Sequence, residues 1–326
     1  MMINRVSRKD PRFLPNPSGL CPCGSGKILA QCCRRFDRVV FKEPSAIRPP
    51  GPPTGYSHPR CYLGFTQNCC SKISGEHFVS QGILRQIGQS VSITGAPWLK
   101  TGEIKTFATK NLTANILCVR HNSAFSDVDT AAIRLFKFVT EINADLAQKS
   151  LSRKKKFYVV SGDDLEMWAT KALLGLFHSQ PKNTELAEYT INPTVVEDAI
   201  RMAKLPKSCG IYLNARLGTP RVHHENEITV GTITLKEERR LIGLVIDIGG
   251  VSFDFLMDPL GVNTLRQGET KLYRPAHLML EGRGRAHVIF LCWSSAHSED
   301  GVVFTRNLNA EAAAHLRSKL RRSKRQ

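Results

Sequence analysis

The chain has 326 residues, of which 41% are hydrophobic and 23% are charged. This length is enough for about two domains, and the composition is near the globular average, which excludes a wholly disordered, fibrous or collagen-like chain. The formal net charge of +18 makes a polyanion, above all a nucleic acid, the expected partner. A solvated basic surface that only keeps the protein soluble is the alternative explanation.

The distribution of apolar residues and cysteines indicates a reducing compartment. No run of eighteen apolar residues occurs, and the first thirty residues carry cations without an apolar stretch behind them, so neither a membrane span nor a signal peptide is expected. We therefore expect a cytoplasmic protein. Clustered thiols in such a compartment indicate metal binding before disulfides.

The first cysteine cluster lies in residues 1–42, in the string CPCGSGKILAQCC. Four thiolates on so short a peptide can surround one zinc ion tetrahedrally, whereas two disulfides there would be strained. Gly24 and Gly26 permit turns with positive φ that bring the thiols together, and Ser25 can hydrogen-bond a sulfur. The expected zinc ligands are Cys21, Cys23, Cys32 and Cys33.

This string resembles the SEC-C motif, a small zinc-binding element attached to many bacterial proteins. The resemblance implies that the cluster binds a structural zinc ion and serves as a docking module for other proteins, without catalysis. Residues 43–59 follow as a linker, because their prolines lack a backbone donor and fix φ.

The segment 60–150 contains a second cysteine cluster in two separated halves. Cys61 and the pair Cys69–Cys70 form the first half, and CVRH forms the second. Separated half-sites of this kind are typical of a zinc ribbon that clamps a β-hairpin to a helix. Either member of the cysteine pair could be the ligand, and His58 is a substitute candidate. The expected ligands are Cys61, Cys69, Cys118 and His121.

Two further features lie beside these half-sites. Glu76-His77 precedes an apolar residue and a predicted strand, and Asn122 directly follows the last expected zinc ligand. Over residues 60–130 the arrangement resembles the HNH family of ββα-metal nucleases. His121 stands where a cysteine is commoner, and Asn122 stands where the last histidine of the family would be.

The resemblance implies the roles of four residues. His77 would be the general base of phosphodiester hydrolysis, while Glu76 and Asn122 would offer oxygen ligands to a catalytic Mg²⁺ or Mn²⁺. The asparagine that orients the base would be Asn115 or Asn111. The ordinary alternatives are that His77 packs beside the zinc ribbon and that Asn122 caps a helix.

Two helices are predicted after this region. Ser126 and Asp129 resemble a capping box at the start of a helix of about twenty residues. Residues 151–205 are expected to be a helical connector, in which Asp163 or Asp164 can cap a second, core helix. The apolar residues that recur at helical spacing in the first helix are Ala132, Leu135, Val139, Ile142 and Leu146.

The remainder of the chain predicts strands and a basic end. In residues 206–306 the β-branched runs GTITL, LIGLVIDIGGVSFDFLM, HVIFLCW and GVVFT are broken by turn residues, which predicts an antiparallel, β-rich domain. Residues 307–326 predict a basic helix that contacts phosphates, or else a solvated tail. The expected fold class is α+β: a zinc knot, a zinc-bound ββα nuclease-like domain with helices, and the β-rich domain.

These observations support a leading hypothesis and two competitors. The leading hypothesis is an HNH-type endonuclease that hydrolyses DNA with Mg²⁺ or Mn²⁺, with defence against foreign DNA as one expected role. The first competitor is a non-catalytic adaptor in which two structural zinc sites stabilise a nucleic-acid-binding or ribosome-binding protein. The second is thiol chemistry at Cys69–Cys70, which predicts a reactive thiol of low pKa.

Overall fold

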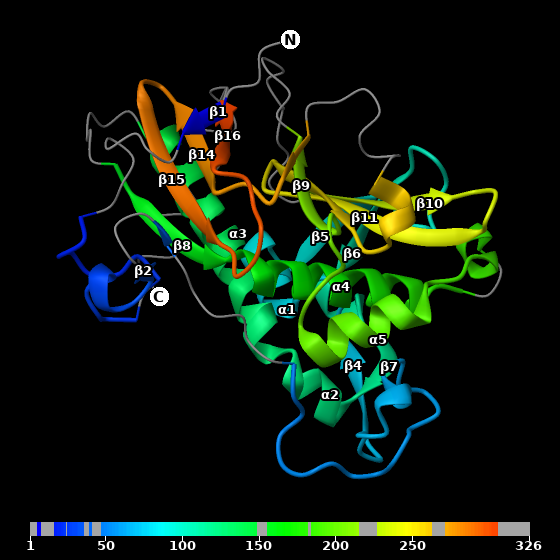
Figure 1. Cartoon of the computed structure of the whole chain (residues 1–326). Helices are drawn as coiled ribbons and strands as arrows, with labels where there is room; N and C mark the ends of the chain where they lie inside the picture. Colours follow the sequence, from blue (N-terminus) through cyan, green and yellow to red (C-terminus); the bar gives the residue numbers. More distant parts are fainter. Residues whose placement is uncertain are drawn as a thin grey trace.

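The computed structural model describes residues 5–7, 16–23, 25–35, 39–40, 47–148, 155–181, 184–214, 227–262 and 271–305. Within these ranges the chain has a mixed α/β architecture with two larger sheets, two small two-stranded sheets and several helices (Figure 1). The predicted basic helix at 307–326 lies outside the described residues, and so does the Arg153-Lys154 part of the predicted connector.

The first large sheet has five strands and joins distant parts of the chain. Its parallel pairs are β14 with β16 and β15 with β8, and the remaining neighbours are antiparallel. Residues 5–7 thus pair with residues 300–302 at one edge. In spatial order the strands are β1 (Arg5–Ser7), β16 (Asp300–Thr305), β14 (His277–Gly282), β15 (Arg285–Cys292) and β8 (Phe157–Ser161).

The second large sheet has seven strands and is antiparallel except where β10 pairs with β5. The β-branched runs predicted as strands are strands in the structure, but they form no separate antiparallel domain. Strands β1, β5, β6 and β8, which precede residue 206, complete the two sheets. In spatial order the strands are β13 (Lys271–Tyr273), β9 (Gly210–Asn214), β12 (Val251–Leu256), β11 (Arg240–Ile248), β10 (Glu227–Leu235), β5 (Ser90–Thr94) and β6 (Ile104–Ala108).

The long helix α3 (Ser126–Ala147) confirms the predicted helical pattern, because all five of its periodic apolar positions are buried. The predicted capping box is absent. The N-cap is Phe125, whose side chain cannot accept a hydrogen bond, and Asp129 instead accepts hydrogen bonds from the side chains of Ser80 and Lys171. The helix therefore begins without a side-chain cap, and Asp129 in its first turn makes a tertiary contact instead.

Helix α4 (Gly162–Ser179) is the central element of the core. Ser161, and neither predicted aspartate, caps it by accepting the Asp164 N–H at 3.1 Å. The indole of Trp168 is fully buried and contacts the ring of Phe136 on α3 and the ring of Phe253 on β12. The helices α3 and α4 pack against each other; both contact β15 of the five-stranded sheet, and α4 also contacts β11 of the seven-stranded sheet. The shorter helices are α1 (Gln81–Ile87), α2 (Val119–Ala124) and α5 (Pro193–Met202).

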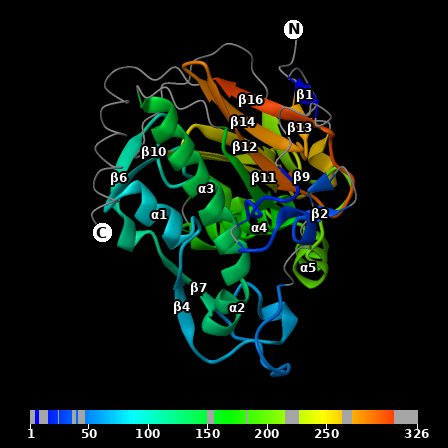
Figure 2. The ribbon, with the colours of Figure 1, turned by 90° about the vertical axis from the view of Figure 1, so that its left-hand side faces the viewer.

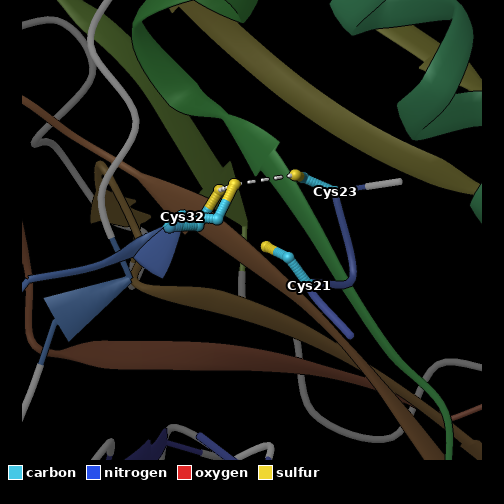
Figure 3. Close-up of side chains that lie close together, drawn as sticks. Cys21, Cys23 and Cys32 are labelled. Carbon is cyan, nitrogen blue, oxygen red and sulfur yellow. Dashed lines mark hydrogen bonds between the residues drawn. The ribbon is translucent and has the colours of Figure 1, made fainter. Parts of the chain in front are cut away.

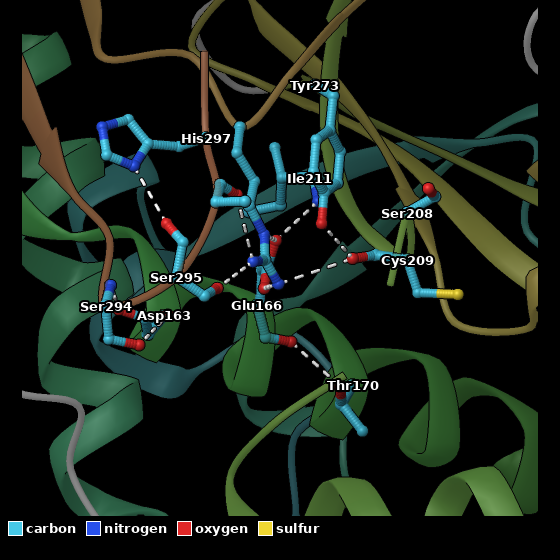
Figure 4. Close-up of polar contacts among 12 residues, drawn as sticks. Asp163, Glu166, Thr170, Ser208, Cys209, Ile211, Tyr273, Ser294, Ser295 and His297 are labelled. Carbon is cyan, nitrogen blue, oxygen red and sulfur yellow. Dashed lines mark hydrogen bonds and ion pairs between the residues drawn. The ribbon is translucent and has the colours of Figure 1, made fainter. Parts of the chain in front are cut away.

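A buried ion pair ties α4 to both large sheets (Figure 4). The guanidinium of Arg274, between β13 and β14, donates to both carboxylate oxygens of Glu166 at 2.8 and 2.7 Å. Glu166 also accepts the Ile211 N–H of β9 at 3.0 Å. One turn earlier, Asp163 accepts the N–H and the hydroxyl of Ser294, which follows β15. Each of these carboxylates is satisfied in the interior, where an unpaired charge would be destabilising.

A small ββα unit lies at the end of the molecule away from the two sheets (Figures 1 and 2). Strand β4 (Ile73–Glu76) pairs antiparallel with β7 (Ala114–Cys118), and α2 begins directly after β7. Ile73 lies opposite Cys118 and Glu76 lies opposite Ala114, with a register shift between them. The other small sheet pairs β2 (Arg34–Arg35) with β3 (Val39–Val40).

Candidate metal centres and the ββα unit

Three thiols and one imidazole converge where β7 meets α2. The Nδ1 atom of His121 lies 3.2 Å from the sulfur of Cys118, 3.5 Å from that of Cys61 and 3.6 Å from that of Cys69. All four residues are buried, and their ligand atoms lie within 4.8 Å of one another. The predicted quartet is thus brought together, and this group could hold a metal ion.

The tautomer of His121 is set by its neighbour Thr66. The Thr66 hydroxyl donates its single proton to the Leu63 carbonyl at 2.8 Å, so it must accept from Nε2–H of His121, 2.9 Å away. This leaves a lone pair on Nδ1, the atom that faces the sulfurs. Burial and the Arg120 charge lower the pKa of His121 to about 4, so the ring is neutral at neutral pH. A neutral imidazole with this tautomer is ready to act as a metal ligand.

The Cys61 thiol needs a cation to ionise. Burial raises the pKa of Cys61 to about 12, so in the absence of a positive charge its thiol is protonated at neutral pH. The N–H of Cys118 points at the Cys61 sulfur at 3.4 Å, and the N–H of His121 points at the Cys118 sulfur at 3.5 Å. Such N–H donors stabilise the thiolate form of a cysteine. Because the Cys61 thiol is protonated in the absence of a cation, metal binding would release a proton.

The structure distinguishes Cys69 from Cys70 and His58, the alternative ligands that the sequence left open. Cys70 lies outside the quartet, where its sulfur accepts the Arg120 N–H at 3.4 Å. His58 is also outside, and its Nδ1 accepts the Arg60 N–H at 3.1 Å. Cys69 is therefore the member of the vicinal pair that faces the quartet.

The N-terminal cysteine cluster also forms a quartet, the N-terminal quartet (Figure 3), so the group of Cys61, Cys69, Cys118 and His121 is called the second quartet. The sulfurs of Cys23 and Cys32 are 3.6 Å apart, and all four predicted cysteines have sulfurs within 4.8 Å of one another. Ser25 places its hydroxyl 3.1 Å from the Cys32 sulfur, as expected. Gly26 has φ +75°, a conformation that favours glycine, whereas Gly24 lies outside the described residues. This group too could hold a metal ion.

One face of the N-terminal quartet is covered by this chain's own five-stranded sheet. Along β15 the side chains alternate: Phe290 and Cys292 face the quartet with its neighbour Leu29, while Ile289 and Leu291 belong to the main core. The sheet is therefore buried on both sides. A docking surface for another protein, which stays a prediction, would have to use the other side of the cluster, where Leu20 is 74% exposed.

The Glu76 carboxylate is occupied by an ion pair. Its Oε1 lies 2.6 Å from the ammonium of Lys171 on α4, and this ammonium also lies 2.7 Å from an oxygen of Asp129 on α3. Glu76 and Lys171 are both buried. Burial raises the pKa of Glu76, and the neighbouring Lys171 charge opposes this shift. The pair joins β4 to the two core helices.

His77 follows β4 directly and is half-buried. Its Nε2 atom is itself buried and has no hydrogen-bond partner within the described part of the chain. Burial and the positive charge of Lys171 lower the pKa of His77, although interaction with the Thr109 backbone opposes them. The imidazole is therefore neutral at neutral pH and can accept a proton.

The three asparagines considered from sequence lie in different environments. Asn122 is half-buried on α2, a helix that packs against β4. Asn115 on β7 and Asn111 are exposed, and no hydrogen bond from either side chain to His77 occurs among the described residues. The Thr109 backbone interacts with His77 where an orienting asparagine was expected.

Sequence reasoning missed Lys171 and Thr66, and it gave Asp129 only a capping role. Lys171 had a detectable signal, because it is a single cation on a helix that is otherwise apolar at that point. Thr66 had none, since its contact with His121 depends on a turn between Cys61 and Cys69.

Comparison with known proteins adds no assignment: no family model matches this chain, and neither a curated protein nor a solved structure is similar to it. Of the helices that are described, none combines the length and the apolar character needed to cross a bilayer.

Proposed function

We propose that both quartets bind zinc and that the second one fixes the geometry of a nuclease site. Four thiolates, or three thiolates and one imidazole, are the donors of structural zinc sites, which are tetrahedral and closed. The Thr66 and Ser25 contacts support this, because partners of the ligands orient structural zinc sites. A zinc ion in the second quartet would hold β7 and the start of α2 against the loop that carries Cys61 and Cys69.

We further propose that the chain is a metal-dependent endonuclease of the HNH type that acts on nucleic acid, DNA being the expected substrate. The observation that carries this proposal is His77, a neutral imidazole with a buried, unbonded Nε2 at the end of β4, in a ββα unit clamped by the second quartet. A general base needs this state, because it must accept a proton near neutral pH. The net charge of +18 supports a polyanionic substrate.

The residues that the resemblance assigns to a catalytic Mg²⁺ or Mn²⁺ fit this role only in part. Asn122 on α2 offers an amide oxygen, whereas the unpartnered Nε2 of His77 is kept for the proton of the attacking water. Glu76 fits poorly, since the Lys171 ammonium already neutralises its carboxylate and would repel a divalent cation. When bound, such a cation would neutralise charge on the phosphate.

In this proposal the chain's own residues divide into a base and a support. His77 removes a proton from the attacking water through Nε2, and the Thr109 backbone holds the ring. Glu76, Lys171 and Asp129 act as positioning residues, because their ion pairs fix the end of β4 against α3 and α4.

Plasmid cleavage tests the proposal. The full-length protein, shown by metal analysis to contain two zinc ions per chain, is incubated with supercoiled plasmid and added Mg²⁺ or Mn²⁺. We expect cleavage, and we expect His77→Ala to slow it by about 10²- to 10⁴-fold, the usual contribution of a general base. The matched control is His58→Ala, which removes an imidazole near the same unit but outside the quartet and should retain cleavage. Absence of cleavage with either cation, or equal rates for His77→Ala, would reject the proposal.

One observation favours a non-catalytic adaptor as the second candidate. The described residues hold only the two quartets as groups of three or more metal-ligating side chains, and Glu76 is engaged by Lys171. Under this alternative the protein binds nucleic acid with steep salt dependence and never cuts it. The plasmid assay separates the two candidates.

A further inference from the structure

A pocket of about 210 Å³ opens between the C-terminal part of α4 and the start of β7. Its walls include the rings of Phe78, Trp98 and Phe107. The volume is below the roughly 300–1,000 Å³ of pockets for drug-sized ligands, which suits a single planar ring system. Two of its wall residues, Glu76 and Phe78, flank His77 along the chain.

The aromatic walls are held in place by packing. The rings of Phe78 and Trp98 meet edge to face, with centroids 5.8 Å apart. Phe78 also lies close to the backbone of α4. Gly175 allows this approach, since a Cβ atom at Gly175 would lie 3.2 Å from the Cβ atom of Phe78. Trp98 is half-buried, so its ring is part wall and part rim. A flat, electron-rich ligand could therefore stack on a rigid aromatic surface.

Polar and charged groups accompany these rings. Glu76, Asn111 and Thr113 are also wall residues; Glu76 is engaged by Lys171, whereas the exposed Asn111 and Thr113 can bond the N–H groups and carbonyls at the edge of a heterocycle. Exposed cations lie beside the walls: Lys105 is 5.7 Å from the centre of the Phe107 ring, and Lys110 precedes Asn111. The pocket thus combines stacking surfaces with cations that can contact a phosphate backbone.

We propose that this pocket binds one unpaired nucleobase of a single-stranded or locally opened nucleic acid. The inference rests on the proposed function, and it deepens it by naming the substrate class. A base stacked on Trp98 with its edge toward Asn111 and Thr113 uses the two interactions by which proteins hold unpaired bases, stacking and edge hydrogen bonds. The exposed lysines beside the pocket then contact the neighbouring phosphates.

Binding without turnover tests this inference. Fluorescence anisotropy of a labelled oligothymidylate is measured with the full-length, zinc-containing protein and no added Mg²⁺ or Mn²⁺. An abasic strand of the same length keeps the phosphates and lacks the bases. We expect the abasic strand to bind more weakly. We also expect Trp98→Ala to weaken oligothymidylate binding roughly 5- to 100-fold, the effect of losing one stacked base, and to leave abasic binding unchanged.

Three variants make the test specific. Trp98→Phe keeps an aromatic wall and should bind nearly as the wild type does, while the quenching of tryptophan fluorescence by the oligonucleotide disappears, because Trp168 and Trp293 are buried. Phe107→Ala removes a second wall and should also weaken binding. The control Tyr56→Ala removes an aromatic side chain that is 43% exposed and lies outside the pocket, and it should bind normally.

The outcomes separate this inference from the nuclease proposal. Equal affinity for the base-containing and abasic strands, or unchanged affinity in both Trp98→Ala and Phe107→Ala, overturns the pocket assignment even if plasmid is cleaved. Base-dependent binding that these variants weaken supports the assignment even if no cation yields cleavage, in which case only the nuclease proposal fails.

Discussion

The two metal-ligating quartets use similar side chains in different structural roles. The N-terminal quartet takes its ligands from a short peptide, Cys21 to Cys33, and packs on the outer face of the five-stranded sheet. The second quartet spans residues 61 to 121, and its cysteines belong to the main hydrophobic core. The first therefore organises a local segment, whereas the second joins parts of the chain that are distant in sequence.

This difference predicts unequal energetic consequences. A metal ion that closes a long loop and completes a core contributes its binding free energy to the folding of the whole unit. A metal ion in a short peripheral peptide contributes mainly to the order of that peptide and its contact with the sheet. The comparison can be tested by removing one ligand from each quartet.

The largest effect is expected for Cys118→Ser. The variant should contain one zinc ion per chain, and its free energy of unfolding should fall by more than about 4 kcal/mol, because the ββα unit loses the ion that fixes it to the core. Metal analysis and denaturant unfolding followed by tryptophan fluorescence measure these changes. The matched control is Cys70→Ser, a neighbouring cysteine outside the quartet, which should keep both ions. A variant that keeps two ions and wild-type stability would contradict the assignment.

An intermediate effect is expected for Cys23→Ser. One zinc ion should again be lost, but the main unfolding transition should shift by about 1 kcal/mol or less, because the tryptophan-containing core does not depend on this quartet. Hydrogen exchange should increase selectively in residues 16–35. If the free energy of the main unfolding transition fell as far as in Cys118→Ser, both quartets would contribute equally to stability. This result would contradict the proposed difference between them.

The smallest effect is expected for Ser25→Ala. Its hydroxyl contacts the Cys32 sulfur, so the variant should still bind two zinc ions but should release one of them to a competing chelator at roughly tenfold lower chelator concentration. Overall stability should remain within about 0.5 kcal/mol of the wild type. Unchanged competition would show that this hydroxyl does not support the site.

Local patterns were enough to predict much of this molecule. The spacing of Leu135, Val139 and Ile142 predicted the buried face of α3, and the cysteine spacing predicted both quartets. These features depend on residues that are close in sequence or on ligand chemistry with few solutions. Strands β10, β11, β12, β15 and β16 were predicted from their β-branched runs in the same way, whereas β13 and β14 were not among the predicted runs.

Contacts set by tertiary packing could not be predicted in this way. Ser126 and Asp129 have the sequence of a cap, but Asp129 gains more by pairing with the buried Lys171. The pairing of β10 with β5 joins residues 227–229 to residues 92–94, which no local pattern encodes. Likewise, the contact between Thr66 and His121 that sets the tautomer forms only once the chain has folded.

The pairing of β1 with β16 has a consequence for how the molecule assembles. These strands are far apart in the described chain, so the outer edge of their sheet cannot close until residues 300–302 have been synthesised. Both metal-ligating quartets lie within residues 21–121 and can assemble long before this step. We therefore expect folding on the ribosome to proceed from metal-held nuclei, with sheet closure as a late and slow event.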